Sequence, residues 1–233
     1  MIDLKNITFA HRGIHNNSYI PENSLKAFKR AIDKNIPIEI DVYILKDNTL
    51  VVFHDSNLFR MTNVNGQIKN YTYKELKKLR LLNTDCYIPT LDEVLKLVNG
   101  KVLLNIEIKN DNRTSDICKI LCEKLDNYNG DFLIQSFYPY IVKWLRDNKK
   151  EYMTGLLLKD DYDSKIINFL STNKVLFNYC KPQFLSVSKK IVTTRKIQKY
   201  RKKFPILVWT IKTDEEINKY RDFTDGFISN NLK

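Results

Sequence analysis

Acidic side chains alternate with apolar ones in two short runs of the sequence. One run reads IEIDV from residue 38, and the other reads NIEIK from residue 105. Successive side chains of a strand point to opposite faces, so Glu39 and Asp41 share one face, and Glu107 and Lys109 share a face of the second strand. If both faces point into one sheet interior, three carboxylates converge there.

Buried carboxylates need a counter-charge, because desolvation of an unpaired charge costs several kcal/mol. Carboxylate oxygens are the ligands that hard divalent cations prefer, so the pattern favours a site for Mg²⁺ or Ca²⁺. The alternative is an ion-pair network in which Lys109 and Arg12 neutralise the acids. The repetition of the acidic pattern on two strands favours the cation.

The chain has only three histidines, and two of them end predicted strands. His11 closes the first strand and His54 closes a strand-like segment after the first acidic run. Histidine is the usual general acid or base near neutral pH, and a pair of them beside a cation suits phosphoryl transfer. The third, His15, lies in a polar loop and is interpreted as a solvated residue.

Short β-rich runs alternate with amphipathic stretches along the chain. Strands are predicted near residues 7–11, 37–44, 102–108, 132–136, 153–158, 184–187, 206–211 and 225–229. Helices are predicted near residues 23–35, 90–99, 114–127, 138–148, 163–173, 190–202 and 213–221. This alternation indicates a parallel sheet with crossover helices, and eight strands in 233 residues predict a (β/α)8 TIM barrel.

One further strand-like segment, residues 50–53, follows the first acidic strand too closely for a parallel crossover, so we expect an antiparallel hairpin. A two-residue turn at Asp47-Asn48 would place His54 opposite Asp41. Residues 55–88 are polar, with a weak helix near residues 73–80, and are interpreted as a small insertion. Residues 1–233 are therefore predicted to form a single barrel domain.

The composition excludes several classes of protein. The net charge is +12 and the chain has six glycines, with no glycine-rich nucleotide-binding motif. The N-terminus lacks the apolar core of a signal peptide, and no apolar run approaches the ~20 residues that span a bilayer. The four cysteines are not arranged as a zinc site and are interpreted as buried free thiols. We therefore expect a cytoplasmic protein.

Taken together, the motifs resemble those of the glycerophosphodiester phosphodiesterase family across nearly the whole chain. They are His11-Arg12-Gly13, Pro21-Glu22-Asn23-Ser24, Glu39-Ile40-Asp41-Val42, Lys46-Asp47, Val51-Val52-Phe53-His54-Asp55, Arg60-Met61-Thr62, Pro89-Thr90-Leu91, Ile106-Glu107-Ile108-Lys109, Gln135-Ser136-Phe137, Trp209-Thr210 and Asp225-Gly226. Each is weak alone, but their order and spacing are specific.

The resemblance implies a TIM barrel that splits glycerophosphodiesters into glycerol 3-phosphate and an alcohol. It implies a divalent cation, Mg²⁺ or Ca²⁺, held by Glu39, Asp41 and Glu107. The implied acid–base pair is His11 and His54, in roles that could be exchanged, and Arg12 and Lys109 bind the phosphate. Trp209, at the end of a predicted strand, is expected to wall the substrate pocket or to pack at the barrel rim.

Other functions remain as alternatives. A related lyase acting on lysophospholipid or sphingolipid head groups shares the barrel and the histidine–acid constellation. An inactive barrel that binds phosphodiesters would be indicated by loss of one histidine or acid, and none is lost here. A nuclease is the most distant alternative. The expected partner is a small glycerophosphodiester, with no nucleic acid and no stable membrane insertion, and the oligomeric state is not indicated. A basic run at residues 195–203 is interpreted as a solvated helix face, with attraction to anionic membranes or nucleic acid as the sharper alternative.

Overall fold

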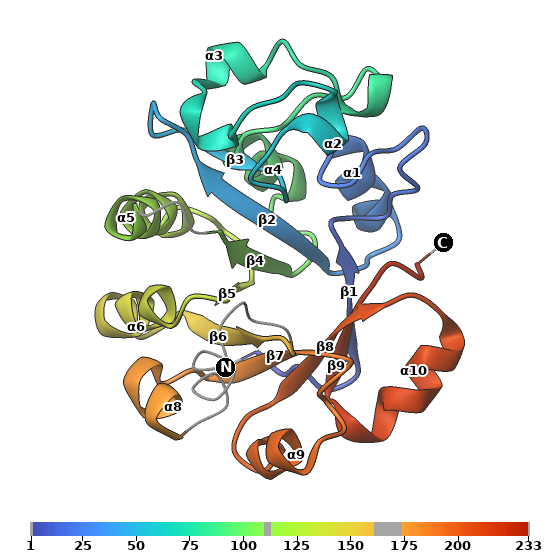
Figure 1. The fold of residues 1–233 in the computed structure, drawn as a ribbon, viewed down its shortest axis with the longest axis vertical. Coiled ribbons are helices and arrows are strands. Elements are labelled where there is room, and N and C mark those ends of the chain that lie inside the picture. Colours follow the sequence, from blue (N-terminus) through green and yellow to red (C-terminus); the bar gives the residue numbers. More distant parts are fainter. Residues whose placement is uncertain (1, 110–112, 161–173, 233) are drawn as a thin grey trace. The chain divides into compact units, whose positions relative to one another are not determined.

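The computed structural model describes residues 2–109, 113–160 and 174–232 (Figure 1). Its contacts divide the chain into two compact units. One unit is Ala10–Phe132, and the other consists of Met1–Phe9 together with Leu133–Lys233. The boundary falls inside strand β1 (Ile7–His11), whose last two residues belong to the first of these units.

The sheet of the unit Ala10–Phe132 is built on β2 (Ile38–Ile44). β2 pairs in parallel with the end of β1 and with β4 (Leu104–Ile108), and it pairs antiparallel with β3 (Leu50–Val52). Glu39 lies between His11 on β1 and Asn105 on β4, and Asp41 lies opposite Glu107. Paired residues of neighbouring strands share a face, so the register places both acidic runs on one side of the sheet.

Helices α1 (Leu25–Asp33), α4 (Leu91–Val98) and α5 (Thr114–Leu125) of this unit lie close to their predicted positions. The side chain of Ser24 caps α1 by accepting from the amide of Ala27. Thr90 and Glu93 form a reciprocal capping box at the start of α4, which satisfies amides that a helix N-terminus leaves without partners. These caps fix where each helix begins after its strand or loop.

The β2–β3 hairpin is present, but its predicted register is wrong by one residue. Asp41 lies opposite Phe53, whose amide donates to the Asp41 carbonyl at 2.9 Å, and not opposite His54. The turn has three residues and not two, because the amide of Leu45 donates to the carbonyl of Thr49. Asn48 ends this loop with a left-handed φ of 67°, a common geometry for three-residue hairpin loops.

Residues 55–88 form short helical turns that pack on the hairpin. They are α2 (Phe59–Thr62), η1 (Ile68–Asn70), α3 (Tyr73–Leu76) and η2 (Leu81–Asn83). Helix α3 is shorter than the predicted helix at 73–80. Leu58, Met61 and Leu76 share a buried cluster with Val51 and Phe53 of the hairpin segment. The polar stretch therefore shares a buried core with the hairpin, and its status as an insertion into a single domain stays a prediction.

The other unit contains the remaining parallel strands and their helices. The strands are β5 (Phe132–Ser136), β6 (Met153–Leu158), β7 (Phe184–Ser188), β8 (Ile206–Ile211) and β9 (Gly226–Ser229), all close to prediction. The helices are α6 (Pro139–Asn148), α8 (Lys174–Cys180), α9 (Arg195–Arg201), α10 (Asp214–Tyr220) and the turn η3 (Arg221–Phe223). The helix predicted at 163–173 lies outside the described residues.

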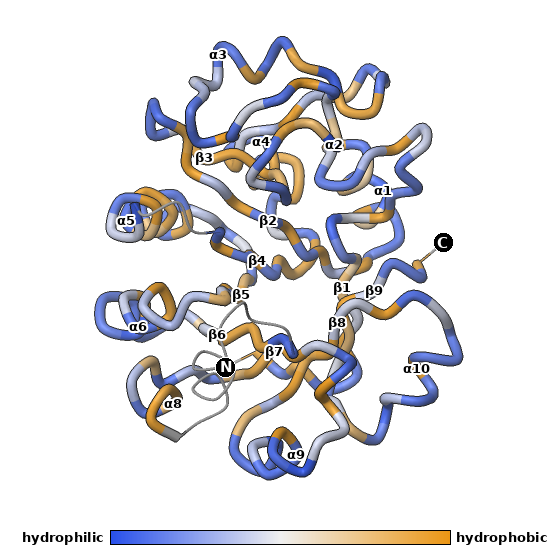
Figure 2. The backbone as a smooth tube through the Cα atoms, in the orientation of Figure 1, coloured by the Kyte–Doolittle hydropathy of each residue, from blue (hydrophilic) through white to orange (hydrophobic). Residues whose placement is uncertain are grey.

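Among the described residues, eight parallel strands alternate with helices, and β3 is the antiparallel addition. The fold is the predicted (β/α)8 TIM barrel. Figure 2 shows apolar strands and largely hydrophilic helix exteriors, as expected for sheets covered by amphipathic helices. In the described part of the chain, no helix has the length and apolar character required to cross a membrane. Its four cysteines are buried free thiols.

Gly155 on β6 makes room for a large side chain on the neighbouring strand. Gly155 pairs with Phe184 of β7, and a Cβ added at Gly155 would overlap the Phe184 ring. Phe184 is fully buried, so its ring cannot move into solvent. The small residue on one strand and the ring on the next therefore fill one space together.

Gly155→Ala should lower the free energy of unfolding by about 1–3 kcal/mol, because overpacking a close-packed interior forces side chains from their preferred rotamers. Denaturant unfolding measures this loss. Combining Gly155→Ala with Phe184→Leu should cost less than the sum of the two single changes. Additive losses would show that the two residues do not share the space.

Candidate active site

Three carboxylates meet on the β2–β4 face of the unit Ala10–Phe132. Glu39, Asp41 and Glu107 are 2%, 1% and 7% exposed. One oxygen atom from each lies within 4.8 Å of the others, an arrangement that could hold a metal ion. The structure therefore brings together the three acids that the alternating pattern predicted to converge.

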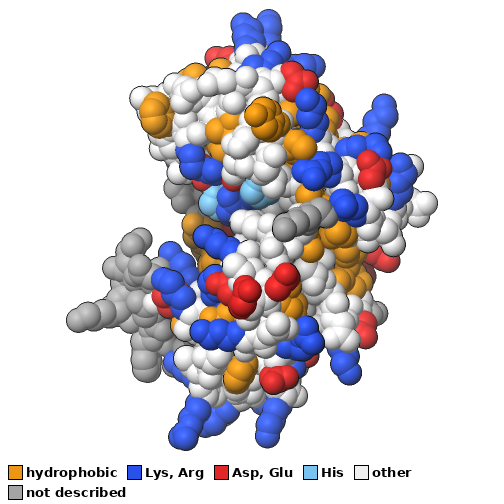
Figure 3. Space-filling model, turned by 90° about the vertical axis from the view of Figure 1, so that its right-hand side faces the viewer, with side chains coloured by type: hydrophobic (Ala, Val, Ile, Leu, Met, Phe, Trp, Pro, Cys, Tyr) orange, Lys and Arg blue, Asp and Glu red, His pale blue; other side chains and the backbone are white. Residues whose placement is uncertain are grey.

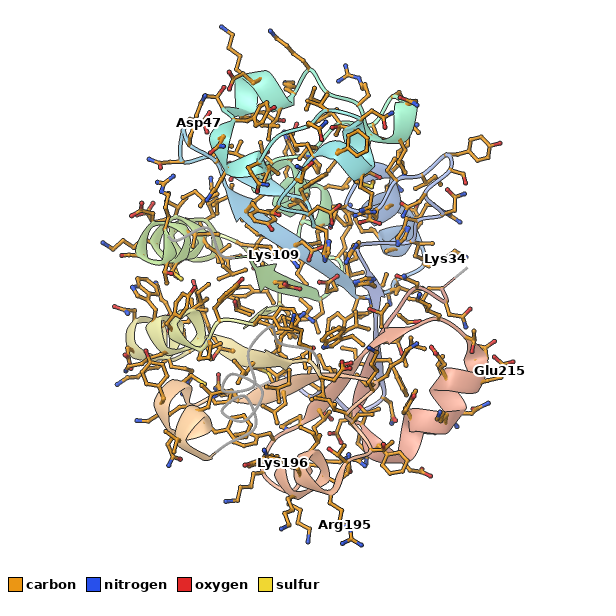
Figure 4. The ribbon with its side chains drawn as sticks, viewed as in Figure 1. Lys34, Asp47, Lys109, Arg195, Lys196 and Glu215 are labelled. Carbon is orange, nitrogen blue, oxygen red and sulfur yellow. The ribbon has the colours of Figure 1, made fainter. Side chains whose placement is uncertain are left out.

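Lys109 and Arg12 also contact these acids. The Nζ atom of Lys109, which Figure 4 labels beside β4, lies 2.8 Å from Oδ1 of Asp41 and 2.5 Å from Oε1 of Glu107. The Nε atom of Arg12 lies 3.3 Å from Oδ2 of Asp41. The ion-pair network considered as an alternative is thus present. It replaces a cation only if it neutralises all three carboxylates.

The pairing is uneven, and the pKa values of the acids diverge. Burial, followed by the charges of Asp41 and Glu107, raises the pKa of Glu39 well above its usual value. Burial likewise raises the pKa of Glu107, although Lys109 opposes the shift. Burial acts on Asp41 in the same direction, but Lys109 and Arg12 outweigh it and hold the pKa of Asp41 below its usual range. The protein alone therefore stabilises the ionised form of Asp41 best.

The network fits an additional cation. Two basic side chains face three carboxylates, and within residues 2–109, 113–160 and 174–232 no basic side chain forms an ion pair with Glu39. Glu39 instead accepts the backbone amide of Arg12 at 3.1 Å. The amide group of Asn23 donates to Asp41, while its Oδ1 is buried with no hydrogen-bond partner in the described structure. The cluster offers only oxygen ligands, and its negative charge exceeds the positive charge of the two basic side chains. Both properties suit Mg²⁺ or Ca²⁺.

The turn that follows β1 positions Arg12. Arg12 and Gly13 both have left-handed backbones, with φ of 59° and 80°. A Cβ at Gly13 would overlap the backbone of Ala27 in α1, so glycine is required for both its conformation and its close approach. The amide of Arg12 also donates to the carbonyl of Glu39 at 3.0 Å. The turn thereby directs the Arg12 side chain back toward the acids.

Both predicted catalytic histidines lie in this unit. His11 ends β1 beside Glu39, and His54 follows β3; both are partly exposed. Figure 3 shows histidine side chains at the surface next to basic side chains. The charge of His54 acts on both Asp41 and Glu107, so the corrected hairpin register still leaves His54 in electrostatic contact with the acids. His15 is also partly exposed in its loop, but both of its ring nitrogens are buried, so its interpretation as a solvated residue is wrong.

Asp55 orients the His54 ring. Its Oδ1 lies 2.6 Å from Nδ1 of His54. Burial opposes ionisation of Asp55, but hydrogen bonds with His54 and Arg60 hold its pKa below the usual range. An ionised carboxylate can only accept, so Nδ1 carries the proton and Nε2 is the ring atom left for proton transfer.

A buried carboxylate that the sequence reasoning left without a role links the two ends of the site. Glu22 accepts from Nη1 of Arg12 at 2.6 Å and from Nη2 of Arg60 at 2.7 Å. Arg60 in turn donates from Nε to Asp55 at 2.5 Å. Glu22 and Arg60 both belong to family motifs of the sequence. Only the folded chain shows that they connect Arg12 with the Asp55–His54 pair.

Trp209 lies in the other unit, on β8. Its ring packs edge-on against Phe137 with centroids 5.6 Å apart, and its indole nitrogen is buried without a hydrogen-bond partner among the described residues. This contact agrees with a packing role. A contact between Trp209 and substrate stays a prediction.

Glu22→Gln should destabilise the protein by about 3 kcal/mol at neutral pH. Burial opposes its charge, but Arg60 and Arg12 lower the pKa of Glu22 from 4.5 to about 2, and a shift of this size corresponds to about that free energy. Because the folded pKa is the lower one, the contribution is complete above pH 4.5 and is lost as pH falls toward 2. Denaturant unfolding across this range measures it.

The exposed Glu123→Gln is the matched control and should leave the free energy of unfolding almost unchanged. A Glu22→Gln deficit that stayed constant below pH 4.5 would contradict the assignment of the effect to the Glu22 charge.

Known proteins resemble this chain along most of its length. A protein of Caldanaerobacter subterraneus named glycerophosphodiester phosphodiesterase is 39% identical over 165 residues, which cover 66% of this chain and 67% of the relative. The solved glycerophosphodiester phosphodiesterase of Thermotoga maritima is 29% identical with a TM-score of 0.77, covering 97% of this chain and 95% of that one.

A phosphodiesterase of Oleispira antarctica, solved with its product sn-glycerol 3-phosphate, has a TM-score of 0.83 at 21% identity, covering 97% of this chain and 94% of that one, and this likeness shows the shared fold. The sequence profile of the glycerophosphoryl diester phosphodiesterase family matches residues 11–233, which include all the acids, histidines and basic residues of the site. The chain therefore belongs to the glycerophosphoryl diester phosphodiesterase family.

Proposed function

We propose that this protein hydrolyses glycerophosphodiesters to glycerol 3-phosphate and an alcohol, with a divalent cation as cofactor. The observation that carries the proposal is the cluster of Glu39, Asp41 and Glu107 within 4.8 Å on the sheet that also positions His11. The family supplies the substrate class, and the Oleispira phosphodiesterase, solved in complex with its product sn-glycerol 3-phosphate, supports it. A cytoplasmic location is part of the proposal, in keeping with the buried free thiols.

Arg12 and Lys109 bind the substrate phosphate. Both side chains already lie against the acidic cluster, with Arg12 Nε and Lys109 Nζ at 3.3 and 2.8 Å from Asp41. Asp41 and Glu22 hold the Arg12 guanidinium from two sides, so its orientation is fixed before substrate arrives. A preorganised cation stabilises developing phosphate charge without the cost of reorientation.

Glu39, Asp41 and Glu107 hold the cation. When bound, Mg²⁺ or Ca²⁺ would stabilise negative charge on the phosphate oxygens. The positive charge of the cation would offset the rise that burial causes in the pKa values of Glu39 and Glu107, so that both would bind it as carboxylates. Lys109 keeps Glu107 and Asp41 fixed relative to each other through its two ion pairs.

His11 and His54 move the protons. One takes a proton from the nucleophile, which is either the neighbouring glycerol hydroxyl or water, and the other protonates the departing alcohol. We assign the base role to His11 and the acid role to His54. Since Asp55 holds Nδ1 of His54 at 2.6 Å, proton transfer at this residue uses Nε2. A glycerol hydroxyl as nucleophile would give a cyclic phosphate first, which ³¹P NMR of the products would detect.

His11→Ala and His54→Ala should each lower kcat by about 10²–10⁴-fold, the usual contribution of a general acid or base. His15→Ala, which removes the third histidine, is the matched control and should keep wild-type kcat. The rate is measured by coupling release of glycerol 3-phosphate to its oxidation. Wild-type turnover by the double variant His11→Ala, His54→Ala would refute this acid–base assignment.

Chelation tests the cofactor. In the same coupled assay with glycerophosphocholine, excess EDTA should abolish turnover, and added Mg²⁺ or Ca²⁺ should restore it. Glu39→Gln should raise the cation concentration required for half-maximal activity by at least about tenfold, because it removes one charged oxygen ligand. Glu123→Gln should leave it unchanged. Activity that EDTA did not change would contradict the proposal that the enzyme needs a divalent cation. Cation binding without any turnover would instead indicate an inactive barrel that binds phosphodiesters.

A further inference from the structure

The excess positive charge of the protein is concentrated in one segment. Residues 164–213 contain twelve Lys and Arg residues and no Asp or Glu. Of the 39 basic residues in the chain, 27 therefore lie elsewhere, and they are balanced by all 27 acidic residues. The net charge of +12 is thus a property of this segment alone and not of the whole surface.

Within this segment the unbalanced charge is exposed around α9. Arg195, Lys199, Lys202 and Lys203 are all exposed, and we call them the α9 basic surface. Figure 4 shows Arg195 pointing outward from α9. In the described ranges of the chain, no acidic side chain forms an ion pair with Arg195, Lys199, Lys202 or Lys203.

Other basic residues of the segment are neutralised locally. Lys189 forms an ion pair with Glu216, Lys190 lies 3.1 Å from Asp160, and Arg201 binds the carbonyl of Thr224 and the carboxylate of Asp225. These three basic side chains therefore stabilise the fold, whereas those of the α9 basic surface face solvent.

Helix α8 lies beside α9 but adds no apolar group to this surface. Phe177 of α8 packs its ring against Tyr200 and Phe204 at centroid distances of 4.4 and 5.8 Å. Val175 and Tyr179 are 65% and 48% exposed, but they lie two positions from Phe177 and therefore on the side of α8 that faces away from α9. The ring of Tyr179 is instead in contact with Lys143 of α6, whose Nζ lies 5.6 Å from its centroid.

We propose that the α9 basic surface docks the protein on an anionic lipid bilayer without inserting a helix. Clusters of four to eight Lys or Arg residues attract the negatively charged headgroups of such a bilayer. On the described part of α8 and α9 only one aromatic ring, Tyr179, is strongly exposed, and it lies against Lys143 of α6, whereas single-stranded nucleic acids are bound on successive rings. A basic surface without such rings therefore favours lipid.

The docking has a chemical rationale that rests on the proposed function. A glycerophosphodiester forms when both acyl esters of a glycerophospholipid are hydrolysed, and that reaction takes place at the membrane. An enzyme held at an anionic surface would lie near the source of its substrate. The docking itself depends only on the α9 basic surface and not on turnover.

Vesicle co-sedimentation tests the proposal. The full chain should bind vesicles of phosphatidylcholine mixed with phosphatidylglycerol and should not bind phosphatidylcholine alone. The triple variant Lys199→Glu, Lys202→Glu, Lys203→Glu should bind the anionic vesicles about 100-fold more weakly or worse, given the usual contribution of each basic residue. Raising the salt concentration should also release the wild-type protein, because it shortens the screening length.

The matched control is Lys34→Glu, Lys101→Glu, Lys119→Glu, three exposed lysines of the other unit that change the net charge equally, and it should retain at least most of the binding. Both triple variants should keep wild-type turnover of soluble glycerophosphocholine, so docking and the proposed function are tested separately. Equal losses in the two variants, equal binding to neutral vesicles, or displacement from vesicles by an equal mass of RNA would each overturn the proposal.

Discussion

The site depends on the electrostatic cost of holding three carboxylates together inside a protein. Glu39, Asp41 and Glu107 lie within 4.8 Å of one another and are almost completely buried. Lys109 and Arg12 compensate part of this charge, but burial and the repulsion between the acids still raise the pKa values of Glu39 and Glu107. Buried acids are costly unless something neutralises them, and groups with strongly shifted pKa values cluster at functional sites. The buried cluster therefore points to a function. In the function that we propose, a divalent cation supplies the missing positive charge.

The need to neutralise the acids also fixes the residues around Arg12. Arg12 is needed beside Asp41, and Glu22 holds Arg12 from the other side. Glu22 also binds Arg60, which binds Asp55, which orients His54. One chain of alternating charges therefore connects Arg12, which we propose binds the phosphate, with His54, which we propose is catalytic. Changes at Glu22 are expected to disturb both ends, whereas changes at either end alone leave the other anchored.

Much of this could be predicted from the sequence because strands alternate with a period of two. That period placed Glu39 with Asp41, and Glu107 with Lys109, on shared faces, and the order of strands and helices predicted the barrel. The hairpin register was wrong because the length of a turn depends on the backbone of single residues, here the left-handed Asn48. The Glu22–Arg60 bridge has no local signature, since its partners are 38 residues apart and meet only through the fold.

The central claim is that the acidic cluster is completed by a divalent cation, and proton release on binding tests it most directly. Burial raises the pKa values of Glu39 and Glu107 in the cation-free protein, so a cation that requires both as carboxylates must displace protons. Calorimetric titration with Mg²⁺ or Ca²⁺ at about pH 5–7, in two buffers of different ionisation enthalpy, counts those protons. We predict binding with proton release, and fewer protons released by Glu39→Gln, in which only Glu107 retains a raised pKa. Binding with no proton release at any of these pH values, or no binding, would contradict the account.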